Sequence, residues 1–215
     1  MPAYKLAIFD WDGTLMDSVA HIVDSMQQAA QVLGEPVPSV SEVRHIIGLG
    51  LPEAIALLFP HASLSTREDI RQQYAKHFLA HSATKSELFT GAQSLLDQLQ
   101  QQGYLLAIAT GKSRLGLDRV LAQTGIGHYF VATRCADETA SKPDPLMLRQ
   151  LLAYTGSSAE QSVMIGDTSY DMAMAQALEM PRIAVSYGVH SKDMLQSYQP
   201  LAIVDSIYQL QDYLI

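Results

Sequence analysis

Short, continuous runs of apolar residues recur along this chain of 215 residues, and segments with helical spacing separate most of them. Such runs are typical of parallel strands that are buried on both faces of a sheet. They predict strands at 5–9, 105–109, 129–133, 162–166, 182–186 and 201–204. Strands that alternate with helices predict an α/β fold, a Rossmann-like, doubly wound parallel sheet that binds ligands at the carboxyl ends of its strands.

Glycine and proline residues mark the ends of the helices expected between these strands. Leucine patterns at helical spacing end before Gly103, Gly125 and Gly156, and glycine readily adopts the left-handed backbone found just past a helix. Pro145 begins the last of these helices, because proline fits a first turn without the loss of a hydrogen bond.

Residues 17–86 interrupt the alternation, because they show helical spacing and no convincing strand pattern. Helices are expected from 19 to 33, from a cap at Ser41 to about Gly48, from Pro52 to Phe59, and from a capping-box pattern at 65–68 to about residue 81. We therefore predict a catalytic core of residues 1–16 and 87–215 with an inserted helical cap domain of residues 17–86. Closure of such a cap over the sheet edge would exclude water and orient a substrate.

The first predicted strand ends at Asp10-Trp11-Asp12-Gly13-Thr14, which places two carboxylates two residues apart at a glycine-permitted turn. Two acids this close repel each other unless a cation lies between them or one is protonated. A hard divalent cation such as Mg²⁺ takes oxygen ligands of this kind. One carboxylate is also a possible nucleophile toward phosphorus. By itself, the pattern fits an Asx turn equally well.

The second predicted strand ends at Thr110-Gly111-Lys112-Ser113. The Thr110 hydroxyl and the backbone N–H groups that open the next helix form a natural seat for phosphate oxygens. A nucleotide-binding loop is excluded, because that motif needs a glycine at position 106, where this chain has leucine.

Two later segments add charged groups. Lys142 precedes Pro143, and a lysine beside a rigid turn can direct a point charge into a site. Gly166-Asp167 ends another predicted strand, and Asp171 follows four residues after Asp167, so that a helix between them could bring both acids to the strand end.

These four motifs, in this order and across nearly the whole chain, resemble those of the haloacid dehalogenase superfamily of phosphohydrolases. The helical insert resembles the cap of the phosphoglycolate phosphatase and β-phosphoglucomutase branch. Within it, the segment Arg44-His45-Ile46-Ile47-Gly48-Leu49-Gly50-Leu51 resembles the substrate loop of that branch.

The resemblance implies a role for each motif. Asp10 would attack phosphorus and form an aspartyl-phosphate, and Asp12 would act as general acid and then as general base. Thr110, Gly111 and Lys142 would bind phosphoryl oxygens.

The resemblance also implies an Mg²⁺ cofactor. Its ligands would be the Asp10 side chain, the Asp12 backbone carbonyl and Asp167, with Asp171 supporting the metal from the second shell. Substrate specificity is a possible role for Arg44, Gly48, Lys112 and His21, although each residue type at these positions also fits an ordinary helix or loop surface.

Composition excludes several other classes of protein. A net charge of −8 at pH 7 disfavours a nucleic-acid partner. The single cysteine, Cys135, allows no internal disulfide and has no assigned role. No apolar run approaches the length of a signal peptide core or a membrane span, so we expect a cytoplasmic protein without a membrane partner, present as a monomer or weak dimer.

The sequence therefore predicts an Mg²⁺-dependent phosphatase that acts on a small phosphorylated metabolite, either phosphoglycolate-like or a sugar phosphate. A sugar phosphomutase of the β-phosphoglucomutase type is the alternative, since it would use the same aspartyl-phosphate. A non-catalytic phosphate-binding module is a third possibility, which the intact set of motif residues disfavours.

Overall fold

A computed structural model describes residues 4–215 of the chain, with side chains for all of them except 81–85. Within this range, six parallel strands form a central sheet in the order β5-β4-β1-β6-β7-β8. The strands are β1 (Leu6–Phe9), β4 (Leu105–Thr110), β5 (Phe130–Cys135), β6 (Ser162–Gly166), β7 (Arg182–Val185) and β8 (Ala202–Val204). The predicted α/β fold and the predicted strands are confirmed.

Helices cover both faces of the sheet, and β1 shows how the sequence produces the two layers. Ala7 and Phe9 pack on one face with leucines of α5, α6 and α10. Leu6 and Ile8 pack on the other face with α7 and α8. Successive side chains of a strand point to opposite faces, so a continuous apolar run is buried on both.

The helices of this part of the chain are α5 (Ala92–Gln101), α6 (Arg114–Thr124), α7 (Leu146–Thr155), α8 (Ser169–Gln176), α9 (Lys192–Gln196) and α10 (Gln211–Leu214). Short 3₁₀ turns span Gly127–Tyr129, Ala136–Glu138 and Ile207–Leu210. The predicted glycine ends are confirmed, because Gly125 and Gly156 cap α6 and α7 in the left-handed conformation.

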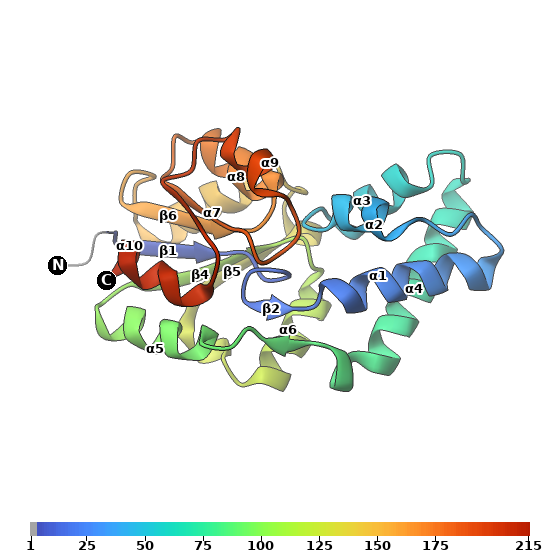
Figure 1. The fold of residues 1–215 in the computed structure, drawn as a ribbon, viewed down its shortest axis with the longest axis horizontal. Coiled ribbons are helices and arrows are strands. Elements are labelled where there is room, and N and C mark those ends of the chain that lie inside the picture. The colour runs from blue at the N-terminus through green and yellow to red at the C-terminus, as the bar shows by residue number, and fades with distance from the viewer. Residues whose placement is uncertain (1–3) are drawn as a thin grey trace.

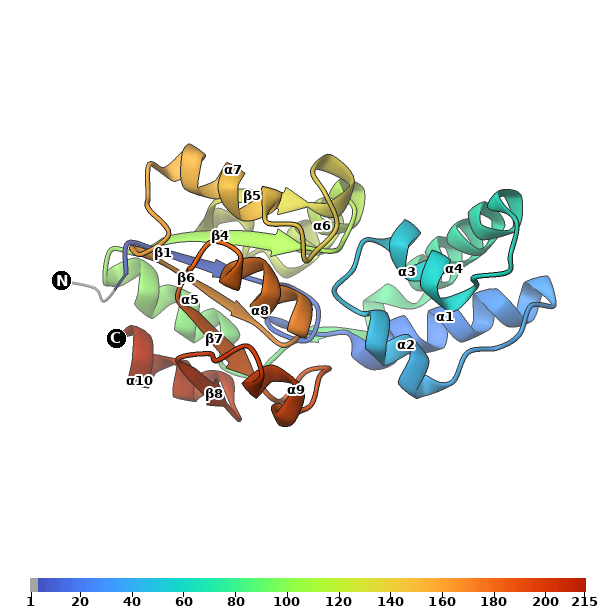
Figure 2. The same ribbon diagram turned by 90° about the horizontal axis from the view of Figure 1, so that it is seen from above.

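Four consecutive helices form a separate layer beyond the carboxyl ends of the strands, as Figures 1 and 2 show. They are α1 (Val19–Leu33), α2 (Val40–Ile46), α3 (Leu51–Leu58) and α4 (Leu64–Lys85), and we call them the helical insert. Met26, Val43, Ile55 and Ile70 are buried in a hydrophobic cluster that belongs mainly to the insert. The helical insert thus has a core of its own.

Two helix starts in the insert lie two residues earlier than the sequence patterns predicted. Ser39, not Ser41, caps α2, because its hydroxyl accepts from the Glu42 N–H and the Glu42 carboxylate accepts from the Ser39 N–H. Ser63, not Ser65, caps α4 by accepting from the Thr66 N–H. In each case two serines lie close together, and the sequence pattern favoured the wrong one.

A pair of short strands connects the helical insert to the sheet. β2 (Met16–Asp17) pairs antiparallel with β3 (Glu87–Leu88) where the chain enters and leaves the insert. The expectation that residues 17–86 contain no strand is therefore wrong at Asp17, since a two-residue strand leaves no recognisable alternation in the sequence. Among the helices of residues 4–215, none is long and apolar enough to cross a membrane.

Candidate active site

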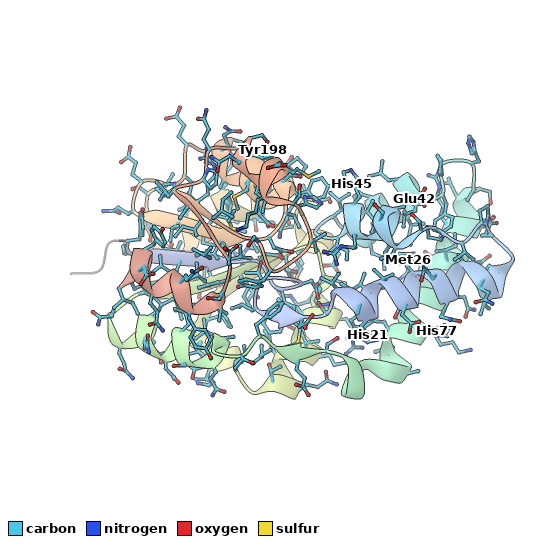
Figure 3. All side chains as sticks on the ribbon, in the orientation of Figure 1. His21, Met26, Glu42, His45, His77 and Tyr198 are labelled. Atoms are coloured by element: carbon cyan, nitrogen blue, oxygen red, sulfur yellow. The ribbon has the colours of Figure 1, made fainter. Side chains whose placement is uncertain are left out.

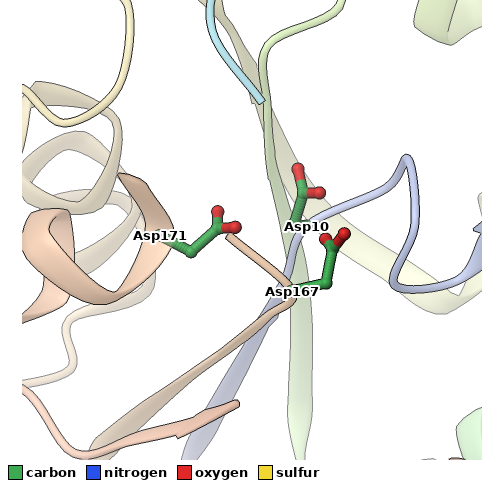
Figure 4. A group of neighbouring side chains, drawn as sticks. All are labelled: Asp10, Asp167 and Asp171. Atoms are coloured by element: carbon green, nitrogen blue, oxygen red, sulfur yellow. The ribbon is translucent and has the colours of Figure 1, made fainter. Parts of the chain in front are cut away.

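The ends of neighbouring strands bring three aspartates together. Asp10 directly follows β1, and Asp167 directly follows β6, the strand beside it in the sheet. Asp171 lies in the first turn of α8. Figure 4 shows the three carboxyl groups converging, and one oxygen of each lies within 4.8 Å of the others. All three residues are almost completely buried.

Lys142 joins this cluster from the segment before α7. Its Nζ donates to Asp10 Oδ1 at 2.5 Å and to Asp171 Oδ1 at 2.6 Å, and the side chain is fully buried. Buried charges are tolerated when they are paired in this way. When Asp10, Asp167, Asp171 and Lys142 are all ionised, the group carries a formal charge of −2, which a divalent cation would balance.

The electrostatics of the cluster reflect this excess negative charge. Burial raises the pKa of Asp10 to about 7, with the charge of Lys142 lowering it and the charge of Asp171 raising it. Burial, together with the charges of Asp10 and Asp171, also raises the pKa of Asp167. Burial opposes the charged form of Lys142, but its two aspartate partners outweigh this effect and raise its pKa. Both shifts favour the protonated carboxyl groups, and a divalent cation would compete with these protons.

The oxygen donors fit a divalent cation. Asp10 Oδ2 is buried and has no hydrogen-bond partner among the described residues. Asp167 is held in place by the Thr14 hydroxyl, which donates to its Oδ1 at 2.9 Å, and by the Val189 N–H, which donates to its Oδ2 at 2.8 Å. Carboxylate oxygens are the ligands that Mg²⁺ prefers in proteins. A bound Mg²⁺ would therefore contact Asp10 and Asp167.

Gly13 is required beside Asp167 for two reasons. Its φ of +85° lies in the left-handed region, and a Cβ atom at this position would overlap the Asp167 carboxyl group. Only glycine satisfies both conditions without strain.

Asp171 has a different hydrogen-bond environment from the other two aspartates. Its Oδ2 accepts from the Thr168 hydroxyl at 2.6 Å and from the Thr168 N–H at 3.1 Å, in the capping box that opens α8. Because its Oδ1 binds Lys142, both oxygens already accept hydrogen bonds. Asp171 therefore orients Lys142, and its support of the metal from the second shell stays a prediction.

Asp12 lies apart from the aspartate cluster, in a polar environment of its own. Its Oδ1 accepts from the Ser18 hydroxyl at 2.5 Å and lies 3.0 Å from Lys112 Nζ. Ser18 occupies the N-cap position of α1, but its hydroxyl donates to Asp12 instead of capping the helix. The local sequence could not reveal this, because the partner lies in the preceding turn.

The proposed phosphate seat lies at the end of β4. Thr110 is fully buried, and its hydroxyl oxygen accepts from the Lys112 N–H at 3.2 Å. Gly111 lies directly beneath the helical insert, since a Cβ atom there would be 2.6 Å from the Gly48 carbonyl oxygen. The same glycine, Gly48, packs against Thr168. The segment that resembles a substrate loop therefore covers the strand ends.

Arg44 joins the insert to the loop that positions Asp167. Its guanidinium donates to the carbonyl oxygens of Gly188 at 2.8 Å and Val189 at 3.1 Å. Val189 in turn donates to Asp167. In this closed arrangement Arg44 binds backbone, and its role in substrate specificity stays a prediction.

A second contact between insert and core surrounds His45. Its carbonyl oxygen accepts from the Tyr170 hydroxyl at 2.9 Å, and its ring stacks on His190 with 5.7 Å between centroids. His190 Nδ1 accepts from the Ser169 N–H at 2.9 Å, and burial lowers the pKa of this histidine. A neutral His190 therefore fits the contact.

His21 lies near the start of α1, beside the junction with the core (Figure 3). Its ring stacks on Phe78 of α4 at 4.1 Å, and its Nδ1 lies 3.0 Å from the Ser86 hydroxyl oxygen. The side chain is 1% exposed. Its predicted place in substrate specificity is untested, and the structure shows it as the packing partner of Phe78.

Several neighbours of the site escaped the sequence analysis. Thr14 stands inside the first motif, where a hydroxyl next to an acidic turn was an available signal. Thr168 could have been found, because its spacing to Asp171 matches a capping box. Phe78 gave no signal, because nothing in the sequence places α4 against the strand ends.

Comparison with known proteins agrees with this geometry. Residues 7–185 match the model of the family described as haloacid dehalogenase-like hydrolase. The phosphoglycolate phosphatase of Vibrio cholerae is 31% identical, over 96% of this chain and 95% of its own length. A Dickeya dadantii protein named "Probable phosphatase IndB" is 33% identical, over 95% of this chain and 91% of its own.

Solved structures extend the match to the whole fold. A haloacid dehalogenase-like hydrolase from Streptococcus pneumoniae superposes with a TM-score of 0.85 at 26% identity, covering 98% of both chains. The expectation of a haloacid dehalogenase-type phosphatase, a phosphoric monoester hydrolase, is confirmed. By its motifs, its fold and its relatives, the chain belongs to the haloacid dehalogenase-like hydrolase family.

Proposed function

We propose that this phosphatase hydrolyses a small phosphorylated metabolite, phosphoglycolate-like or a sugar phosphate, by an Mg²⁺-dependent route through an aspartyl-phosphate on Asp10. The observation that supports the proposal most strongly is the set of contacts made by the two oxygens of the Asp10 carboxyl group. One oxygen binds Lys142, and the other is buried without a partner among the described residues, beside Asp167 and Asp171. The relatives named as phosphoglycolate phosphatases support the substrate class.

Asp10 would act as the nucleophile through one oxygen of its carboxylate, while the other oxygen would remain available to Mg²⁺. Lys142 holds Oδ1 and would reduce the repulsion between this carboxylate and an incoming phosphate dianion. Thr110 and Gly111, at the end of β4, would receive the remaining phosphoryl oxygens. When bound by Asp10, Asp167 and the Asp12 backbone carbonyl, Mg²⁺ would supply further charge neutralisation.

Asp12 would donate a proton to the leaving alcohol and later accept one from water. A positioned general acid or base of this kind contributes about 10²- to 10⁴-fold to the rate. Ser18 and Lys112 hold its Oδ1 and so fix the direction of the carboxyl group.

The helical insert would act as a cap domain, with the boundaries at residues 17 and 86 predicted from the sequence. Its own hydrophobic cluster and the narrow connection through β2 and β3 support a unit that moves relative to the sheet. Opening would admit the substrate and closing would exclude water. A cytoplasmic location and a monomeric or weakly dimeric state remain proposals from the sequence.

A substrate screen tests the proposed function. Purified protein is assayed for phosphate release from p-nitrophenyl phosphate, 2-phosphoglycolate and a panel of sugar phosphates, with Mg²⁺ and with excess EDTA. We expect Mg²⁺-dependent release that EDTA abolishes. Isomerisation of a sugar phosphate on addition of a sugar bisphosphate, without release, would favour the phosphomutase instead. No reaction with any compound would contradict the proposal.

A further inference from the structure

Phe78 on α4 is the centre of a mixed aromatic and cationic group between insert and core. Tyr74, one turn earlier, lies 5.7 Å from it between ring centroids. From the core, Lys112 Nζ lies 4.8 Å from the Phe78 ring centroid and Arg119 Cζ lies 5.7 Å from it. We call Tyr74, Phe78, Lys112 and Arg119 the Phe78 cluster. It joins the proposed site through Lys112, which is paired with Asp12.

The two cations of the Phe78 cluster differ in their partners. Lys112 is neutralised by Asp12 at 3.0 Å. Among the residues that the structure describes, none forms a salt bridge with Arg119, and its buried Nε has no hydrogen-bond acceptor. A buried donor without an acceptor is costly, so native structures rarely leave one unless something else occupies the position.

Other arginines show how unusual this is. Side-chain hydrogen bonds to carboxylates, carbonyl oxygens or an amide are donated by Arg44, Arg67, Arg71, Arg114, Arg134 and Arg182. Arg149 is exposed and can be satisfied by water. Within the described chain, Arg119 is therefore the arginine with a buried N–H donor, at Nε, that has no acceptor.

Arg119 and the proposed general acid, Asp12, both influence the hydroxyl group of Tyr74. Burial raises the pKa of the Tyr74 hydroxyl, the charge of Asp12 raises it further, and the charge of Arg119 lowers it. Lys112 links Arg119 to the proposed general acid, because its Nζ lies 3.0 Å from Asp12 Oδ1 and over the same Phe78 ring as the Arg119 guanidinium. Contact with an aromatic ring leaves the N–H donors of an arginine free to bind an anion.

We propose that Arg119, assisted by Lys112, binds a second anionic group carried by the leaving alcohol of the substrate. This inference rests on the proposed function. The group would be a carboxylate or a second phosphate, because planar guanidinium donors suit both. Arg119 is then a specificity-determining residue: it selects phosphate esters of acidic alcohols over esters of neutral ones, while the aspartate cluster carries out the reaction on either.

Matched substrates test the inference. 2-Phosphoglycolate is compared with 2-hydroxyethyl phosphate, which replaces the carboxylate by a neutral CH₂OH group, and glucose 1,6-bisphosphate is compared with glucose 6-phosphate. The readout is the ratio of kcat/KM within each pair. We expect the wild-type protein to prefer the acidic member of one pair, and that pair identifies the anion as a carboxylate or as a phosphate.

Variants of Arg119 test whether this residue causes the preference for the acidic substrate of a pair. Arg119→Met keeps the apolar stem but removes the charge, and we expect it to reduce the ratio about 10- to 100-fold, as for loss of a charged hydrogen bond. Arg119→Lys keeps the positive charge, so it should retain part of the wild-type ratio. Arg149→Met, which removes an exposed charge on α7, should leave the ratio as in the wild type. Thermal melts establish that each variant is folded.

The possible failures are distinguishable. If p-nitrophenyl phosphate is hydrolysed but neither pair shows a preference, or if Arg119→Met keeps the wild-type ratio, the inference is wrong and the proposed function stands. If no phosphate ester is hydrolysed, the proposed function fails, and the inference falls with it.

Discussion

Asp10 and Lys142 carry the main charge interaction of the site, and each is buried because the other is present. Lys142 is shared between Asp10 and Asp171, which leaves the aspartates with more negative charge than the lysine can balance. Burial, together with the charge of Asp171, raises the pKa of Asp10 to about 7 although Lys142 lowers it. The same imbalance favours a divalent cation, and Asp10 Oδ2 has no hydrogen-bond partner among the described residues.

Replacement of Asp10 by asparagine should abolish catalysis without affecting the stability of the fold. We expect Asp10→Asn to lose turnover by on the order of 10⁶-fold, as expected for removal of a nucleophile. We do not expect a lower melting temperature in metal-free buffer, because the substitution removes a like charge from a crowded, buried group. Steady-state assays and thermal melts measure both effects. Activity close to that of the wild type would identify another nucleophile.

Cys135 illustrates a buried residue without a chemical role. Its side chain is inaccessible, and burial raises the pKa of its thiol to about 12. We expect slow reaction with a disulfide reagent at pH 8 in the native protein and rapid reaction in guanidinium chloride. As the single cysteine of the chain, it gives an unambiguous signal. Rapid labelling of the native protein would show that the thiol is accessible after all.

Individual residues of the site were predictable to different extents. Asp10 and Asp167 follow strand ends and Lys142 precedes a proline turn, so their positions in the sequence already indicate a common edge of the sheet. Arg119 and Phe78 are ordinary residues of ordinary helices, and their contact depends on how the insert packs on the core. A contact of that kind leaves no pattern in a single sequence.

At the scale of elements, hydrophobic patterns predicted the sheet well because each strand is buried on both faces. Helix starts in the insert were shifted by two residues, since Ser39 and Ser63 compete with nearby serines as caps. The pairing of β2 with β3 was missed, because two-residue strands are too short to show alternation. Periodicity therefore predicts long elements and fails for short ones.

The packing of the helical insert against the end of β4 leads to a testable prediction about these elements. A Cβ atom on Gly111 would collide with the backbone carbonyls of Gly48 and Leu49. We expect Gly111→Ala to hold the insert away from the core, which lowers kcat/KM by about 10- to 100-fold because a misplacement of about 1 Å has effects of this size. Steady-state kinetics on the preferred substrate measure the loss.

A matched glycine serves as the control for Gly111→Ala. Gly127 lies in a 3₁₀ turn remote from the insert, and a Cβ atom there would make an ordinary contact of 3.6 Å with Leu121. Gly127→Ala should retain full activity. Wild-type kinetics for Gly111→Ala would mean that the insert does not close on β4 during turnover.

For the whole molecule, we expect the binding of Mg²⁺ at the aspartate cluster to stabilise the folded state. At a concentration of Mg²⁺ about 100 times its Kd, binding adds about 2.7 kcal/mol to the free energy of unfolding, or roughly 5–10 °C in melting temperature for a chain of this size. Asp167→Asn should lose this shift. Asp193→Asn, an exposed control on α9, should keep it.

The pH dependence of this stabilisation follows from Asp10. Its pKa is raised from an ordinary value of 3.8 to about 7 in the metal-free protein, so that the stability contributed by its protonated form is full below pH 3.8 and is lost as the pH rises through 7. Mg²⁺ competes with this proton. We therefore expect the Mg²⁺-induced increase in melting temperature to be larger at pH 8 than at pH 5; a shift that is equal at both would contradict coupling to Asp10.

The central claim is that the strand ends assemble a site in which Asp10 captures a phosphoryl group. Acid quenching of the protein during turnover of its preferred substrate with Mg²⁺, followed by mass spectrometry of the peptides, tests it most directly. The account predicts a phosphoryl adduct on the peptide that contains Asp10, absent in Asp10→Asn and absent when EDTA is present. Turnover with no adduct on that peptide, or with an adduct on another residue, would contradict it.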